Sequence, residues 1–179
     1  MSTPEQAAKP GDQARASVFV RVDVPTAFEI FTAEIDRWWR RGFRFRSSGR
    51  DPGTMVLERG VGGRVYERIE RSGATEDVEI GRVLLWEPPS RFVLEWRAQN
   101  FAPDERTEVE VSFEPRREGA WVTITHRGWA AIRPDHPARH GEAVDAFLRT
   151  MGLWWGDLLS SLRAHAARAA ESATRSSRD

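Results

Sequence analysis

The chain has 179 residues, equal numbers of basic and acidic side chains (27 each) and no Cys. This length suits one domain with a sizeable core. A net charge of zero gives no overall attraction to nucleic acid or an anionic membrane. The lack of Cys excludes disulfides, thiolate catalysis and Cys-ligated metal sites, and fits a cytoplasmic protein. No segment approaches the roughly 20 apolar residues that span a bilayer.

The first part of the chain predicts a leader, a strand and two short helices. Residues 1–13 are polar and aperiodic, which favours a disordered leader. Residues 16–22 alternate in polarity and are rich in β-branched side chains, as in a strand. Pro25 then suits the first turn of a helix, and a second helical turn carries Trp38 and Trp39.

The middle of the chain reads as a series of short strands. Gly, Pro and Ser make residues 42–53 a loop, and tight turn signals separate the segments that follow. Short connections favour antiparallel neighbours. The predicted strands span about 54–59, 63–70, 77–87, 91–98, 106–114 and 120–128.

A long helix from about 140 to 169 is predicted to close the domain, followed by a disordered tail over 170–179. Its apolar residues fall within one stripe when the residues are placed at helical angles. These are Val144, Leu148, Met151, Trp155, Leu158, Leu159 and Leu162. Gly152 lies at the edge of the stripe and marks either a close approach or a tolerated weak point. The sequence therefore predicts one domain over 14–169, an α+β fold whose antiparallel sheet grips this helix.

Two polar residues lie in phase with apolar ones on the predicted strands. Glu67 stands between Val65 and Ile69, and His126 follows Val122 and Ile124 at two-residue spacing. If these rows face the helix, both side chains point into the apolar interior. They are the candidate catalytic pair, since a carboxyl and an imidazole that meet there could polarise a bound carbonyl or hydroxyl. A structural hydrogen bond for each is the alternative.

Several motifs resemble a known superfamily. These are the segment from Gly62 to Arg68, Gly81-Arg82-Val83 with Trp86-Glu87-Pro88-Pro89, Trp96, and His126-Arg127-Gly128-Trp129. Together they resemble the SRPBCC (START-like) superfamily, in the branch similar to the activator of heat-shock protein 90 ATPase. The Trp38-Trp39 pair, and Gly152 followed by Trp154-Trp155, also fit that branch, and the resemblance covers about residues 15–165. It implies a helix-grip fold with six to seven strands, two short helices after the first strand, and ligand binding, polyketide cyclisation or hydration, or stress response as activities.

From these observations we expect non-catalytic binding of a small hydrophobic or amphipathic molecule in the sheet–helix cavity, with no cofactor and no metal. Apolar walls would supply affinity, and a few polar groups would orient the ligand. The candidate ligand-binding residues are Trp39, Phe45, Val65, Glu67, Phe92, Leu94, Trp96, Ile124, His126, Leu148, Met151 and Trp155. Eight Trp and nine Phe could also fill that cavity.

Other functions remain open on the sequence. One alternative is a polyketide cyclase-like or hydratase-like enzyme that uses Glu67 and His126. Another is a chaperone-associated or stress-response interaction module, and a homodimer is a further alternative. The Arg-rich and aromatic segment 37–46 could stack on single-stranded nucleic acid or receive an acidic head group, but a solvated Arg face over packed Trp is favoured. Zinc is not favoured, because Pro137 separates His136 from His140.

Overall fold

The computed structural model describes residues 11–49, 51, 53–97 and 100–176. Seven strands form one antiparallel sheet in the order β1-β7-β6-β5-β4-β3-β2. The strands are β1 (Gln13–Val20), β2 (Gly53–Leu57), β3 (Arg64–Arg71), β4 (Ala74–Glu87), β5 (Arg91–Trp96), β6 (Thr107–Arg116) and β7 (Gly119–Arg127). The helices are α1 (Val24–Ala33), α2 (Ile35–Trp38) and α3 (Val144–Ser176), with 3₁₀ turns η1 (Trp129–Ala131) and η2 (Pro137–Arg139).

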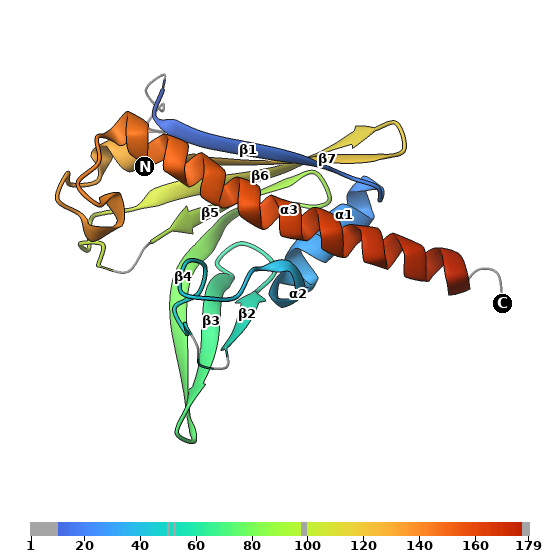
Figure 1. The fold of residues 1–179 in the computed structure, drawn as a ribbon, viewed down its shortest axis with the longest axis horizontal. Coiled ribbons are helices and arrows are strands. Elements are labelled where there is room, and N and C mark those ends of the chain that lie inside the picture. Colours follow the sequence, from blue (N-terminus) through green and yellow to red (C-terminus); the bar gives the residue numbers. More distant parts are fainter. Residues whose placement is uncertain (1–10, 50, 52, 98–99, 177–179) are drawn as a thin grey trace.

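The sheet curls around α3, which runs along β1, and this confirms the predicted helix-grip architecture (Figure 1). The first strand and the last pair with each other, from Gln13 opposite Arg127 to Val20 opposite Ala120. The earliest and latest strands of the chain are therefore neighbours in the sheet, and α3 packs on β1. The β3–β4 hairpin projects from the body of the molecule (Figure 1).

Helix α1 begins where the sequence predicts. The Asp23 side chain accepts a hydrogen bond from the Thr26 backbone N–H at 2.9 Å, and Pro25 lies in the first turn. Its buried face carries Phe28 and Phe31, whose rings pack against Phe92 and Phe113 of the sheet. The helix therefore closes one end of the interior with aromatic contacts.

Helix α3 follows the predicted apolar stripe, but its boundaries differ from the prediction. Leu148, Trp155, Leu158, Leu159 and Leu162 are buried and Met151 is half-buried. The helix begins at Val144 instead of 140 because His140 and Gly141 adopt left-handed backbone angles.

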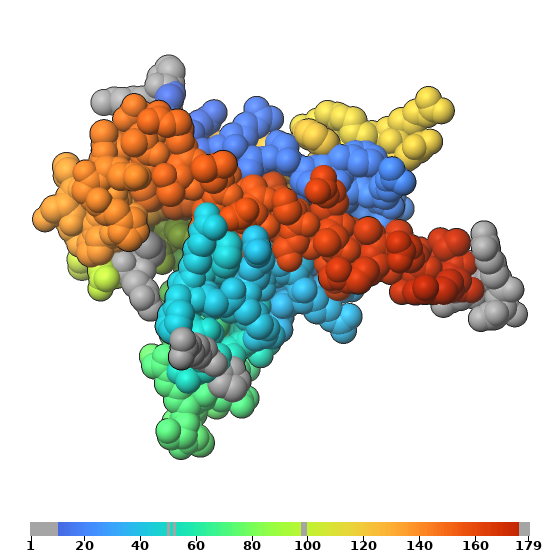
Figure 2. Space-filling model, viewed as in Figure 1, coloured from blue at the N-terminus to red at the C-terminus, as the bar shows by residue number. Residues whose placement is uncertain are grey.

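In place of the tail expected from residue 170, α3 continues to Ser176. Residues 170–176 contain neither Gly nor Pro, and Ala170, Glu171, Ala173 and Arg175 are residues with high helix propensity. This end of α3 projects beyond the rest of the molecule (Figure 2). The expected leader lies mostly outside the described residues, and Gln13 already belongs to β1. No helix within the described ranges is long and apolar enough to cross a membrane.

Candidate functional site

Four tryptophans from three elements meet between the sheet and α3, and we call them the tryptophan cluster. Trp39 follows α2, Trp96 ends β5, and Trp154 and Trp155 lie on α3. The Trp39 ring stacks on Trp96 at a centroid distance of 6.2 Å and meets Trp155 edge-on at 5.9 Å. Trp96 and Trp155 are 5.6 Å apart. Such offset and edge-to-face contacts are the favoured geometry for aromatic rings.

A covering loop, described at residues 40–49 and 51, lies over this cluster. Its Phe45 ring stacks on Trp154 at 5.7 Å, and the Trp154 indole N–H donates to the Arg44 carbonyl at 2.8 Å. The Arg44 guanidinium also pairs with Asp157 of α3 at 2.7 Å. The Trp39 indole N–H donates to the Phe45 carbonyl at 2.9 Å. The loop thus contacts both sides of the cluster.

A buried arginine holds the base of the covering loop. The Arg46 guanidinium donates to Asp36 Oδ1 at 2.7 Å, to the Trp39 carbonyl at 2.7 Å and to the Gly53 carbonyl at 3.1 Å. Burial opposes ionisation of Asp36. The hydrogen bonds from the Met55 backbone N–H and from Arg46 outweigh this effect and hold the pKa of Asp36 below its usual value. Asp36 therefore remains ionised at neutral pH.

Glu67 is buried, as the alternation of β3 predicts, and it too contacts the covering loop. Its carboxylate accepts hydrogen bonds from the Ser48 backbone N–H at 3.0 Å and from the Ser48 hydroxyl at 2.5 Å. A Cβ at Gly53 would collide with Glu67 Oε1. An alanine at Gly53 would therefore force the Glu67 or Ser48 side chain to shift where the loop returns to β2. These contacts fit a structural role for Glu67.

His126 forms a separate polar centre beside Trp96 and Trp155 of the tryptophan cluster. Its Nδ1 accepts the Trp155 indole N–H at 3.2 Å, and its Nε2 lies 2.7 Å from the Thr107 hydroxyl. An indole N–H only donates, so Nδ1 carries no proton and the proton of the neutral ring lies on Nε2. Burial lowers the pKa of His126 to about 3. The imidazole is therefore neutral at physiological pH.

The structure does not bring Glu67 and His126 together. They lie on β3 and β7, which are separated in the sheet by β4, β5 and β6. Each has its own partners, and no hydrogen bond among the described residues joins the two side chains. The sequence could not reveal this, because alternation gives the face of a strand but not its place in the sheet.

The other candidate residues divide between the two ends of the interior. Phe92 packs among Phe28, Phe31 and Phe113 near α1, whereas Leu148 belongs to a second core cluster with Trp129 and Phe147. The remaining buried or half-buried candidates in the main core are Val65, Leu94, Ile124 and Met151. Sequence reasoning missed Trp154, Thr107, Arg46 and Ser48 as site residues. Trp154 alone carried a signal, since it flanks the helical stripe.

The comparisons with known proteins identify the family and the fold. The family model for Activator of Hsp90 ATPase homolog 1-like protein matches residues 22–165. The chain belongs to this family. The match includes α1, the covering loop, β2 to β7 and the part of α3 that carries Trp154 and Trp155. Among curated proteins, no relative of the chain was found.

Solved structures share the fold of this Activator of Hsp90 ATPase homolog 1-like chain at low identity. Protein MLL2253 from Mesorhizobium loti is 17% identical with a TM-score of 0.58, covering 87% of this chain and 97% of its own. SA2116 from Staphylococcus aureus is 11% identical with a TM-score of 0.63, covering 89% and 95%. The Aha1 dimer from Colwellia psychrerythraea is 14% identical with a TM-score of 0.55, covering 84% and 92%. At these identities the likeness shows the fold alone.

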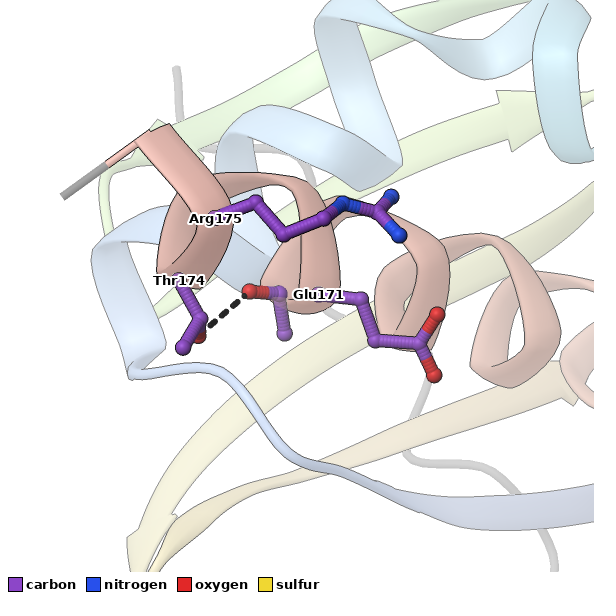
Figure 3. Close-up of a pocket in the computed structure, with 4 residues that line it drawn as sticks. Glu171, Thr174 and Arg175 are labelled. Atoms are coloured by element: carbon purple, nitrogen blue, oxygen red, sulfur yellow. Dashed lines mark hydrogen bonds between the residues drawn. The ribbon is translucent and has the colours of Figure 1, made fainter. Parts of the chain in front are cut away.

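An open hollow of about 370 Å³ lies elsewhere, at the C-terminal end of α3 in this family member (Figure 3). It is lined by Ala170, Glu171, Thr174 and Arg175, and the Thr174 hydroxyl donates to the Ala170 carbonyl at 3.0 Å. Glu171, Thr174 and Arg175 are exposed. The hollow lacks the enclosed apolar walls typical of a ligand site.

Proposed function

We propose that this protein binds one small, mainly apolar molecule between the sheet and α3, without changing it chemically. The observation that carries the proposal is the tryptophan cluster beneath the covering loop. Aromatic rings supply large apolar contact area. The indole N–H groups of Trp39, Trp154 and Trp155 already donate to acceptors within the protein, so the surface that the cluster offers is mainly apolar. Burying about 200 Å² of apolar ligand surface on these rings would contribute roughly 5 kcal/mol.

The route to the cluster leads between the covering loop and α3. The rings contact one another, so a bound molecule has to separate Phe45 from Trp154. The ion pair on that side is weak, because both Arg44 and Asp157 are more than a third exposed and such pairs contribute about 0–1 kcal/mol. The base of the loop is held by Arg46 and Glu67, which are both buried. The loop can therefore open toward α3 while its base stays in place.

The state of the two ionisable candidates supports binding without catalysis. A base with a pKa of about 3 accepts protons poorly at neutral pH, and both ring nitrogens of His126 already have partners. The carboxylate oxygens of Glu67 both accept from Ser48. A cyclase or hydratase would need one of these groups free to reach the substrate.

Native mass spectrometry of protein purified from its own host tests the proposal. We expect a stoichiometric apolar adduct, which solvent extraction then identifies. The adduct should be lost in Trp96→Ala and retained in Trp121→Ala, a matched change at a half-buried tryptophan whose sheet neighbours Ala120 and Val122 face the core. Adduct-free protein that also fails to bind apolar probes, such as decan-1-ol, would overturn the proposal.

A second function, self-association, is favoured by two exposed apolar side chains. Phe43 of the covering loop is 76% exposed and Leu153 of α3 is 71% exposed. The hydrogen bond from Trp154 to the Arg44 carbonyl joins the segments that carry them. Sedimentation of the wild type against Phe43→Ser/Leu153→Ser tests a dimer. A dimer that the double variant abolishes supports it, and a monomeric wild type excludes it.

A further inference from the structure

Three buried nitrogen donors at the N-terminal end of α3 lack acceptors among the described residues. They are Trp129 Nε1, His136 Nε2 and Arg139 Nε. His136 Nδ1 accepts the Ala138 backbone N–H at 3.1 Å, so the proton of the neutral ring lies on Nε2. The Trp129 and His136 rings both pack edge-on against Phe101, at 5.7 and 4.9 Å. We call Trp129, His136 and Arg139 the donor group.

Arg139 adds an uncompensated positive charge to this group. Its side chain donates to the Ile132 and Glu142 carbonyls, both at 3.2 Å, and forms no ion pair with a described carboxylate. Arg46 is equally buried but has Asp36 as its partner. Burying a charge without a counter-charge is unfavourable, so the surroundings of Arg139 favour an anion.

The charges around the donor group leave this preference intact. Trp129 packs on Phe147 in the first turns of α3 at 4.6 Å, and a helix N-terminus carries partial positive charge. Arg133 is neutralised by Glu105. Asp145 of α3 is exposed and pairs with Arg149, and the Asp12 carboxylate accepts the Ala130 backbone N–H at 2.9 Å. Glu142 is exposed as well.

Trp129 connects the donor group to the tryptophan cluster through His126. The Trp129 ring lies 5.3 Å from the His126 ring, which in turn lies 5.8 Å from Trp96 and 6.0 Å from Trp155. A molecule bound along these rings has its apolar part at the tryptophan cluster and one end near Trp129.

We propose that the ligand is an apolar carboxylic acid whose carboxylate accepts hydrogen bonds from Trp129, His136 and Arg139. This inference rests on the proposed function, since it names the chemical class of the molecule bound there. A carboxylate offers about four lone pairs and one negative charge, which match three N–H donors and an unpaired guanidinium.

Decanoate and decan-1-ol form the test pair, because they share a chain and differ in the charged head. We expect the wild type to bind decanoate about tenfold or more tightly than decan-1-ol, as hydrogen bonds to charged groups predict. Arg139→Gln and Trp129→Phe should each bring the ratio of the two affinities, decanoate to decan-1-ol, close to one. Arg116→Gln, at an exposed arginine of the β6–β7 hairpin, is the control and should leave the ratio unchanged.

Nuclear magnetic resonance of the wild type keeps the test valid if a variant misfolds. Decanoate should shift the Trp129 indole and His136 imidazole N–H signals, and decan-1-ol should not. Equal affinities with unmoved signals would show that water satisfies the donors, and would overturn this inference alone. A ratio abolished by Arg44→Gln would place the head group at the covering loop and also overturn it. Binding of neither probe would overturn the proposed function as well.

Discussion

At the scale of single residues, the contacts of Glu67 predict a stability effect that a purely catalytic residue would not show. Glu67→Gln keeps one acceptor oxygen and places an amide NH2 against one of the two donors of Ser48. We expect the free energy of unfolding to fall by about 1–3 kcal/mol, since one buried donor loses its acceptor. Urea unfolding measures this. Glu70→Gln, an exposed change on the same strand, should have almost no effect. Unchanged stability in Glu67→Gln would show that Glu67 does not anchor the loop.

The neutral state of His126 predicts a second effect, in the pH dependence of stability. Its pKa is about 3 in the folded protein against an ordinary value of 6.5. The unfolded chain therefore binds a proton that the folded chain does not, and folding loses stability as the pH falls from about 6.5 toward 3. At about 1.4 kcal/mol per pH unit, roughly 2 kcal/mol is lost by about pH 5. His126→Phe should unfold with a correspondingly flatter pH dependence between about pH 5 and 6.5. Parallel curves for the two proteins would contradict this assignment.

At the scale of elements, two arginines of the covering loop make similar contacts at very different depths. Arg46 and Arg41 both pair with Asp36 and donate to the Gly53 carbonyl, but their side chains are 1% and 64% exposed. Arg46→Met should lower the free energy of unfolding by about 3 kcal/mol, because it leaves buried acceptors unpaired. Arg41→Met should change it by less than about 1 kcal/mol. Urea unfolding and hydrogen exchange of the loop measure both, and equal effects would mean that Arg46 does not hold the loop.

These arginines also show where sequence reasoning stops. Alternation of apolar residues predicted the strands and the burial of Glu67, and helical spacing predicted the face of α3. Nothing in the segment 37–46 distinguishes Arg46 from Arg44, because its burial depends on where the loop returns to Gly53. The partner of Glu67 was equally hidden, since Ser48 is nineteen residues away on a segment without periodicity. Contacts that depend on loop conformation cannot be derived from periodicity.

At the scale of the whole molecule, α3 packs along β1 to close the fold, and Gly152 faces Arg15 of that strand. A Cβ there would meet only the Arg15 carbonyl, at 3.8 Å, which is an ordinary van der Waals distance. Of the two interpretations that the sequence allowed, the tolerated weak point therefore fits better than a close approach. Gly152→Ala should raise the free energy of unfolding by about 0.5–1 kcal/mol, because alanine loses less backbone entropy in a helix.

The matched change for Gly152 is Gly53→Ala, where the new methyl group would collide with Glu67 and Ser48. We expect Gly53→Ala to destabilise the protein while Gly152→Ala stabilises it, both measured by urea unfolding. The two changes in stability would have opposite signs because the free space around each glycine decides whether an added methyl group stabilises or destabilises the protein. If Gly152→Ala destabilised the protein, α3 would have to approach β1 more closely than 3.8 Å allows, and the sheet would grip the helix at Gly152 itself.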